Sequence, residues 1–223
     1  MSRSLGTIDG VNITEEDDKS VTYTAGAHLD GDGANGQFGE APCYAPKSFS
    51  GKTLDALANA GGPGNWFGVV TDTGERSGTP VVQGAGDPCP GAFVSATSLH
   101  LPDQDGKPLP RSSPFRYVDS ATVPYIVVPP IIISGVAGVV LGCRAIVTNT
   151  KNGKSVEAVV ADVGPKDKIG EISVACAKGL GVSDDSATHP ANSGGVDAHI
   201  IHYQLFPGVA AVVDGVTYPL QHS

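Results

Sequence analysis

The chain has 223 residues, a formal net charge of -9 at pH 7, and 40% hydrophobic residues. This length suits one well-buried domain, and 30 glycines with 17 prolines favour many short strands joined by turns. The negative charge excludes a general nucleic-acid binder, because a surface without a basic stripe repels the phosphate backbone.

The first part of the chain is polar. Residues 1–20 include the acidic run at residues 15–18, so we predict a flexible N-terminal arm, followed by a single domain at residues 21–223. No apolar stretch of the kind found in signal peptides follows Arg3. If the protein is secreted, we expect that such a signal has been removed.

The next part of the chain predicts strands and loops. Between residues 21 and 82, short apolar runs alternate with Gly, Pro and Asn clusters, with one short helix expected at residues 53–60. The most apolar stretch, residues 123–142, is interrupted by prolines and three glycines and is rich in β-branched residues. It predicts buried strands and turns, not a membrane span.

The clearest local signal is a β-hairpin. Asn152-Gly153 stands between two β-branched runs, and this dipeptide favours a two-residue type I′ turn. After Gly164-Pro165, the spacing of Ile172, Cys176 and Leu180 predicts a short helix, with Ser173 as its cap and Gly179 or Gly181 as its end. Two strands are expected to follow, at residues 199–206 and 210–216.

The four cysteines are widely spaced: Cys43, Cys89, Cys143 and Cys176. They form no CxxC pair, which makes a zinc site improbable. Two disulfides or four buried thiols remain as alternatives. An extracellular protein would oxidise these thiols, so two disulfides are expected if the chain is secreted.

Two carboxylates, Asp162 and Glu171, are candidates for catalysis. Asp162 lies where a strand is expected to end, and Glu171 lies nine residues later, before the predicted helix. Two carboxyl groups at the same edge of a sheet can act as acid and base when their surroundings give them different pKa values. The structural alternative is that Asp162 stabilises its own turn and Glu171 favours the helix N-terminus.

Two further positions have both a structural and a functional interpretation. Residues 30–36, DGDGANG, begin like a calcium loop, but Ala34 and Ala41 stand where two ligands are required. A tight turn and a pair of amine-binding carboxylates, Asp30 and Asp32, are the alternatives. Trp66, the only tryptophan, is expected either to fill the core or to stack on a sugar.

Five segments in chain order resemble the fungal-type chitosanases of glycoside hydrolase family 75. The segments are DGDGAN (residues 30–35), LANAGGPGNWFGVVTD (57–72), PVVQ with DPCPGAFVSATSL (within 80–99), RYVDSATVPYIVVP (116–129) and ADVGPKDKIGEISVACAKGLGV (161–182). The similarity runs from about Asp30 to residue 208, and five ordered motifs are far more specific than any one of them.

The resemblance implies endo-hydrolysis of β-1,4 bonds in chitosan, a glucosamine polymer, with inversion at the anomeric carbon. The family's essential Asp, in a D-x-GP segment, and essential Glu, in the G-E segment that follows, fall on Asp162 and Glu171. No metal or other cofactor is implied. The resemblance also implies a secreted monomer whose partners are chitosan or glucosamine oligomers, without nucleic acid or membrane, and makes residues 21–223 the catalytic domain.

Residues 145–180 are also similar to the double-psi β-barrel proteins of the expansin and family 45 endoglucanase kind. We therefore expect a mainly β fold with a six-stranded double-psi barrel core, extra strands, loops and one or two short helices. In those enzymes the acid stands at the position of Glu171. This likeness implies Glu171 as general acid and Asp162 as general base.

Chitosan is polycationic, so carboxylates in the matching motifs are expected to bind it. The candidates are Asp30, Asp32 and Asp119, with Tyr117 and Trp66 as stacking surfaces. Asp119 has a structural alternative, because it precedes Ser120 and would cap a turn. Two other functions stay open: a polysaccharide-binding or wall-loosening module without hydrolysis, and an enzyme that cleaves peptidoglycan.

Overall fold

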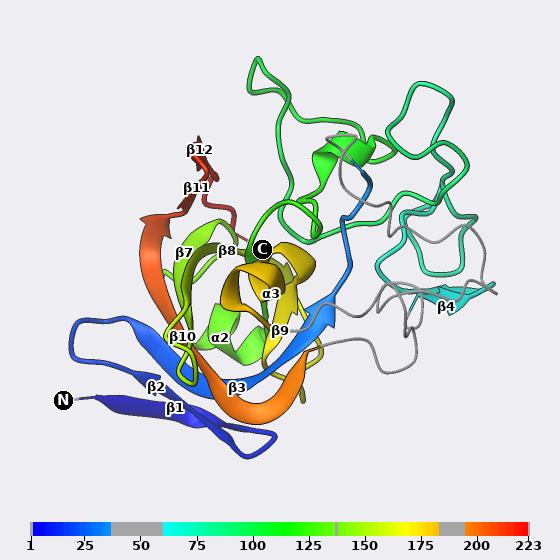
Figure 1. Cartoon of the computed structure of the whole chain (residues 1–223). Coiled ribbons are helices and arrows are strands. Elements are labelled where there is room, and N and C mark those ends of the chain that lie inside the picture. The colour runs from blue at the N-terminus through cyan, green and yellow to red at the C-terminus, as the bar shows by residue number, and fades with distance from the viewer. Residues whose placement is uncertain (1, 37–59, 137, 183–194, 223) are drawn as a thin grey trace.

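The computed structural model describes residues 2–36, 60–136, 138–182 and 195–222. Six of its strands close into a barrel, which is the left-hand body in Figure 1. These strands are β3 (Val21–Asp30), β6 (Tyr125–Val128), β7 (Cys143–Asn149), β8 (Ser155–Val163), β9 (Glu171–Ser173) and β10 (Val196–Ala210). Their order is β3-β10-β7-β8-β6-β9, and β9 pairs back with β3. The predicted mainly β fold with a six-stranded barrel core is confirmed.

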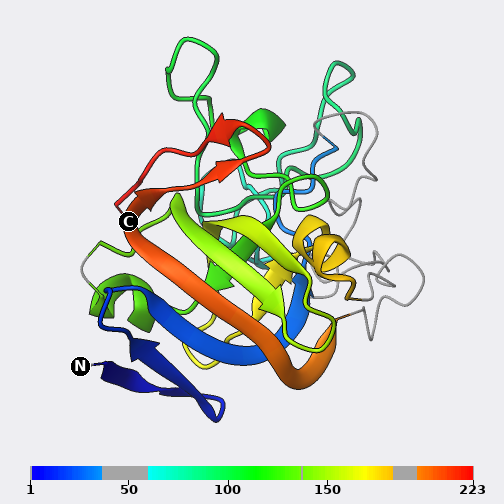
Figure 2. The same cartoon turned by 60° about the vertical axis from the view of Figure 1, so that its left-hand side comes forward.

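The barrel combines parallel and antiparallel neighbours. β3 with β9 and β6 with β8 are parallel, and the other four pairs are antiparallel. Figure 2 shows β10 lying between β3 and β7. Alternate residues of β7 are buried, as expected when one face of a strand meets a core and the other meets solvent.

Aromatic side chains fill part of the barrel. Tyr23 and Tyr203 stack with their ring centroids 4.6 Å apart, and the Tyr203 hydroxyl donates a hydrogen bond to the Gly26 carbonyl at 2.7 Å. Tyr125 and Ile172 are fully buried. Burial of these large side chains is the main favourable contribution to the stability of the barrel.

The predicted flexible N-terminal arm is wrong for most of its length. β1 (Arg3–Ile8) and β2 (Val11–Glu15) form a hairpin that extends the sheet beside β3, at the lower left of Figure 1. Asp9 and Gly10 both have positive φ, 48° and 77°, as a two-residue type I′ turn requires. Ile8, Val11 and Ile13 are buried in the main core, so packing holds this hairpin in place.

The hairpin predicted around Asn152-Gly153 is confirmed, but its predicted turn type is wrong. β7 and β8 pair from Arg144 with Val159 to Thr148 with Ser155, and the Asn149 N–H donates to the Lys154 carbonyl. Four residues therefore form the loop. Gly153 has a φ of 75°, whereas Asn152 is not among the residues with positive φ that a type I′ turn would need.

The predicted helix after Gly164-Pro165 is confirmed as α3 (Val174–Leu180). The Ser173 side chain accepts a hydrogen bond from the Cys176 N–H at 3.0 Å, and Gly181 ends the helix in the left-handed conformation. A second short helix, α2 (Pro130–Gly135), stands where only strands and turns were expected after β6. Among the described residues, no helix is long and apolar enough to span a membrane.

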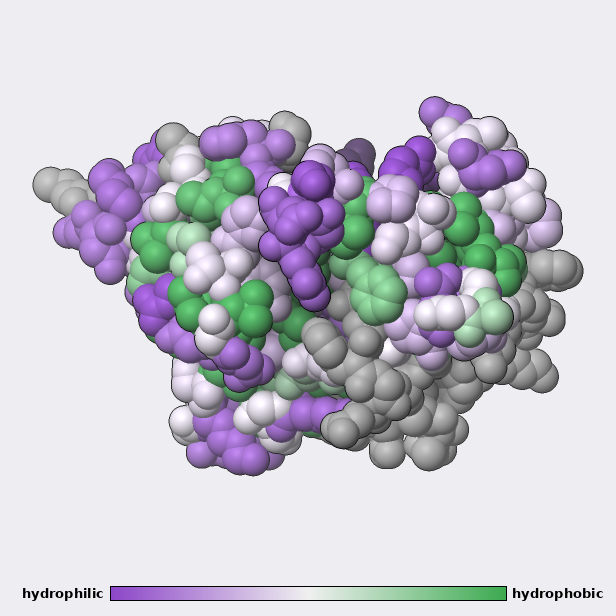
Figure 3. All heavy atoms as spheres, turned by 90° about the horizontal axis from the view of Figure 1, so that it is seen from above, coloured by the Kyte–Doolittle hydropathy of each residue, from purple (hydrophilic) through white to green (hydrophobic). Residues whose placement is uncertain are grey.

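The C-terminal part continues with β10 and a small hairpin. β10 is longer than the strand predicted at residues 199–206, and β11 (Val212–Val213) pairs with β12 (Val216–Thr217). Several valines in this part of the chain are exposed. On the face of the molecule shown in Figure 3, the hydrophobic patches are small and are separated by hydrophilic side chains. Residues 53–59 of the predicted early helix lie outside the described residues.

A second layer, formed by residues 60–124, lies beside the barrel at the upper right of Figure 1. It consists mostly of loops, with two short strands and one helical turn: β4 (Gly61–Gly62), β5 (Asn65–Trp66) and η1 (Pro114–Arg116). Val70, Val94 and Tyr117 form a small core of its own. The Leu99 N–H donates to the Ala161 carbonyl, which joins this layer to the end of β8.

The prediction of two disulfides is wrong. Cys143 and Cys176 are free, buried thiols, so four cysteines cannot form two bonds. Burial raises the pKa of the Cys176 thiol to about 12, which keeps it protonated and unreactive. Cys89 is not among the free thiols, and Cys43 lies outside the described residues.

Candidate active site

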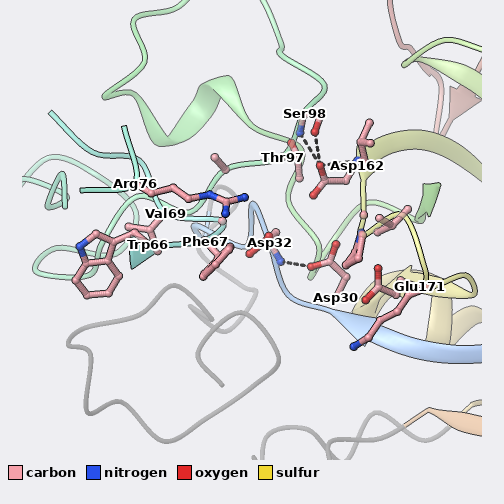
Figure 4. Close-up of a pocket in the computed structure, with 17 residues that line it drawn as sticks. Asp30, Asp32, Trp66, Phe67, Val69, Arg76, Thr97, Ser98, Asp162 and Glu171 are labelled. Carbon is pink, nitrogen blue, oxygen red and sulfur yellow. Dashed lines mark hydrogen bonds between the residues drawn. The ribbon is translucent and has the colours of Figure 1, made fainter. Parts of the chain in front are cut away.

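A cleft of about 770 Å³ lies between the rim of the barrel and the loop layer. The barrel contributes Val127, Asp162 and Glu171 to it. A further barrel strand, β3, contributes its last residue, Asp30, and the rest of the lining comes mainly from the loops, including Asp32, Trp66, Phe67, Gly68, Arg76, Thr97, Ser98, Gly164 and Lys168. Five of the seven residues predicted for the site therefore meet in one cleft, whose close-up is Figure 4.

The register of three strands brings Asp162 and Glu171 to the same face. In the sheet, Val127 of β6 lies opposite Asp162 of β8 on one side and opposite Glu171 of β9 on the other. Residues directly opposite one another in neighbouring strands point to the same face. With a strand spacing of about 4.8 Å, the backbones of the two acids stand roughly 9 to 10 Å apart. The eight residues between them, 163–170, therefore return the chain to the same edge of the sheet.

Asp162 is buried and strongly hydrogen-bonded. Its Oδ1 accepts hydrogen bonds from the Ser98 N–H at 3.0 Å, from the Ser98 hydroxyl, and from the Val163 N–H at 2.8 Å. None of these bonds uses Oδ2. Burial raises the pKa of Asp162, and the bonds from Ser98 and Val163 oppose this rise because they stabilise the carboxylate.

Replacing Ser98 with Ala should narrow the pH range in which Asp162 is ionised. The S98A variant loses the hydroxyl donor, which lowers the pKa of Asp162 more than either backbone donor does. For a reaction that uses Asp162 as base, we expect the acidic limb of kcat/KM to move to higher pH, with roughly a tenfold lower rate at pH 5. Ser112 is exposed, so S112A is the control; an unchanged acidic limb in S98A would exclude this role.

Gly164, which follows the strand end, leaves room for the Glu171 carboxylate. A Cβ at position 164 would lie 2.7 Å from Glu171 Oε2 and 3.0 Å from a methyl carbon of Val127. The backbone φ of Gly164 is not in the left-handed region, so alanine fits the local conformation. The requirement for glycine here comes from the close approach of Glu171.

Gly164→Ala should therefore reduce activity while the fold is kept. The added methyl group displaces a flexible carboxylate, and a misplacement of about 1 Å can cost roughly 100-fold in rate. For a reaction that uses Glu171, we expect kcat to fall between about tenfold and 100-fold, with the melting temperature nearly unchanged. Gly86→Ala is the matched control, because a Cβ there meets no atom within 4 Å. Equal kcat values for both variants would contradict this prediction.

The end of β3 and the turn that follows it place two more acids in the cleft. Asp30 Oδ1 accepts a hydrogen bond from the Asp32 N–H at 2.8 Å, so the tight-turn interpretation is correct. Oxygen atoms of Asp30, Asp32 and Asp162 also lie within 4.8 Å of one another, a spacing at which a cation fits between carboxylates. Such clusters are common without an ion, and we assign no metal to this one.

Asp30 is in an unfavourable place for a charge. Burial, followed by the negative charges of Asp32, Asp162 and Glu171, raises the pKa of Asp30 well above its usual range. Its backbone carbonyl accepts a hydrogen bond from the Ser120 hydroxyl. Figure 4 shows Asp30 between Asp32 and Glu171.

Tyr117 and Asp119 are not brought into the cleft. Tyr117 is buried, and its hydroxyl donates a hydrogen bond to the Arg111 carbonyl at 2.8 Å. Asp119 is fully buried, and its Oδ1 accepts a hydrogen bond from the Ala121 N–H. The turn-capping alternative is thus the correct one for Asp119, and neither side chain can contact a substrate in this cleft.

Trp66 belongs to the lining, but the residue is only 4% exposed. It packs edge-on against Phe93, with ring centroids 5.5 Å apart, and Figure 4 shows the ring turned away from the acids. The next residue, Phe67, is 38% exposed in the same cleft. Phe67, and not Trp66, is therefore the aromatic surface that a ligand can reach.

Several residues of the cleft were not singled out from the sequence, among them Ser98, Phe67, Arg76 and Lys168. Ser98 lies inside a segment that resembles the chitosanases, and this likeness was the only available signal. Phe67 is the next residue after Trp66, so the aromatic pair was visible in the sequence although only Trp66 was chosen. Arg76 places its guanidinium 4.2 Å from the centre of the Phe67 ring, and Lys168 lies in the loop before Glu171.

The arrangement is suited to acid–base catalysis, because two acids, from the strands on either side of β6, face the same cleft. Asp162 is oriented by three donors, and Glu171 lies across Val127 from it. In comparisons with known proteins, no protein-family model matches the chain and no curated protein matches it significantly. The interpretation of the site therefore depends on its own geometry and on the motif resemblance.

Proposed function

We propose that the protein is an endo-acting glycoside hydrolase, a chitosanase, that cleaves β-1,4 bonds of chitosan with inversion. The observation that carries this proposal is the alignment of Asp162 and Glu171 on either side of Val127, facing one cleft. The five ordered segments that resemble family 75 chitosanases support the choice of substrate.

In the proposed mechanism, Glu171 is the general acid and Asp162 the general base. Glu171 donates a proton to the glycosidic oxygen while the bond to the anomeric carbon breaks. Asp162 Oδ2 removes a proton from a water molecule that attacks the opposite face of the sugar. Inverting enzymes need about 6.5 to 9.5 Å between the two carboxyl groups, and two strand spacings of about 4.8 Å are compatible with this separation.

The acidic cleft suits a cationic polymer. Among the described residues, Asp32 and Asp162 are the acids in it to which neither the mechanism nor the inference below assigns a proton, and the net charge of -9 of the chain favours the approach of protonated amines. Asp30 and Asp32 were predicted to bind substrate, and both lie close to Asp162. Phe67 offers an exposed ring on which a sugar can stack.

The setting of the enzyme is part of the proposal. Chitosan is a polymer too large to enter a cell, so the protein is proposed to act after secretion. Action as a monomer is proposed from the resemblance to the chitosanases alone. Hydrolysis by the two carboxylates requires no metal.

Peptidoglycan is a second candidate substrate, because the cleft also contains cations. Arg76 and Lys168 line it, and neither has an ion pair with another described residue. Cationic side chains in a cleft suit a glycan that carries carboxylates, as peptidoglycan does. The five ordered segments that resemble the chitosanases nevertheless favour chitosan.

A product assay tests the proposal. The protein is incubated with chitosan of known acetylation, reducing ends are counted, and the first-formed anomer is identified by NMR. Release of oligomers with inverted configuration is expected. Retained configuration would contradict the two-carboxylate scheme, binding without products would indicate a non-hydrolytic module, and lysis of cell walls without chitosan cleavage would favour peptidoglycan.

A further inference from the structure

The proposed mechanism uses Asp162 and Glu171 and leaves the acid at the end of β3 without a chemical role. Asp30 is 8% exposed and Asp162 is 9% exposed, so both side chains are shielded from water. Oxygen atoms of the two carboxyl groups lie within 4.8 Å of each other. Two buried carboxylates at this distance cannot both be ionised without strong repulsion, so the pair retains one proton.

The hydrogen bonds of the two acids are unequal. Asp162 accepts three hydrogen bonds, two from Ser98 and one from Val163, which stabilise a carboxylate. Among the described residues, the Asp30 carboxyl group accepts one, from the Asp32 N–H. The negative charge is therefore better stabilised on Asp162, and the proton is better placed on Asp30.

The other groups around Asp30 favour the same distribution. Asp32 lies on the turn after β3, Glu171 on β9, and the Tyr125 hydroxyl, from β6, donates to the Asp32 carbonyl. Together with burial, the negative charges of Asp32, Asp162 and Glu171 raise the pKa of Asp30 well above its usual range. Arg76 and Lys168 are the cations of this cleft, and neither contributes to the shift in the pKa of Asp30.

We propose that Asp30 is a positioning residue that carries the proton of the Asp30–Asp162 pair, so that Asp162 is the ionised member and can act as base. This inference rests on the proposed hydrolase function. It gives Asp30 a role other than the binding of substrate amines, because a protonated carboxyl group has no charge to offer an ammonium group.

The first test locates the proton without measuring activity. The carboxyl carbons of Asp30 and Asp162 are titrated by ¹³C NMR in the wild type and in the D30N and D162N variants. In D162N, the titration of Asp30 should move to lower pH, because a neighbouring negative charge has been removed. In D30N, the titration of Asp162 should hardly move, because its partner was already neutral. Asp197→Asn, at a fully exposed side chain, is the control and should change neither.

The second test compares two substitutions of Asp30. Asn reproduces the shape of the protonated acid and can accept the hydrogen bond from Asp32, whereas Ala leaves that N–H group without its acceptor. We expect kcat on chitosan to fall about fivefold in D30N and about 100-fold in D30A. If D30A does not fold, the D30N rate and the NMR titrations still decide the question.

The outcomes separate this inference from the proposed function. The reverse pattern, in which D30N lowers the titration of Asp162 and D162N leaves Asp30 unchanged, would overturn it, as would the absence of any cross-effect. A loss of more than about 100-fold in D30N would also overturn it, because an ionised Asp30 would then be required. A wild-type protein that releases no products from chitosan refutes the proposed function, while the titrations still report where the proton lies.

Discussion

Glu171→Gln is expected to lower kcat on chitosan by roughly 1,000-fold, because glutamine cannot donate a proton to the glycosidic oxygen. Glutamine has nearly the same shape as glutamate and fits beside Gly164 and Val127, so the fold and substrate binding should be retained. The expected result is therefore a loss of kcat with little change in KM. Initial rates of reducing-end release over a range of chitosan concentrations measure both.

The control for this variant is Glu157→Gln on β8. Glu157 is exposed and forms an ion pair with Arg144, and surface pairs of this kind contribute little to stability. E157Q should keep wild-type kinetics. If E171Q turned over chitosan within about tenfold of the wild type, Glu171 would not be the general acid.

Asp162→Asn should also reduce kcat by roughly 1,000-fold, through loss of the base that activates water. The asparagine side chain can still accept the hydrogen bonds from Ser98 and Val163 through its oxygen, so the local structure should persist. Measurement of kcat in D162N, with D197N as the control for loss of an exposed acid, tests the prediction. A residual rate above about one tenth of the wild-type rate would exclude Asp162 as the base.

The same variant should be more stable than the wild type at neutral pH. Burial raises the pKa of Asp162 in the folded state, so the unfolded chain releases this proton more readily than the folded protein does. Stability consequently falls as the pH rises from the ordinary range for Asp through the folded-state pKa. Asparagine does not ionise, so D162N should melt a few degrees higher at pH 7, and the gap should close below about pH 3.

These effects have a common origin in the crowding of acids at the barrel rim. Asp30, Asp162 and Glu171 come from three strands, and each is placed by backbone pairing that would persist without its charge. When buried acids lie this close together and at least one of them is ionised, the folded state is less stable than it would be without the charge. The predicted gain in stability for D162N, accompanied by loss of activity, would be a direct measure of this cost.

Local features of the fold were readable from the sequence because they depend on neighbouring residues. Ser173 caps α3 through a bond to the N–H three residues later, and the apolar spacing of that helix is local. The hairpin around Asn152-Gly153 was predicted for the same reason. The Asp9-Gly10 turn carried an equally good signal, but the acidic run that follows favoured a flexible arm, and the burial of Ile8, Val11 and Ile13 reversed that prediction.

The positions of the two central acids, where a strand ends and before a helix, also followed from the sequence. Their meeting did not, since it depends on β6, a strand from a distant part of the chain, lying between β8 and β9. Tyr117 and Asp119 were predicted to bind substrate, but the tertiary structure keeps both out of the cleft. Both lie in segments that resemble the chitosanases, but a carbonyl partner at Arg111 and a turn at Ala121 keep them buried.

The sequence by itself thus determined the β class, the main hairpin, the capped helix and the two acids at strand ends, because hydrogen bonding and side-chain alternation act over a few residues. Only the tertiary structure decided that Asp162 and Glu171 share a cleft, that Phe67 replaces Trp66 as the accessible ring, and that Asp30 lies against Asp162. Protonation depends on the distance between charges and on the exclusion of water, and both are set by the closing of the barrel.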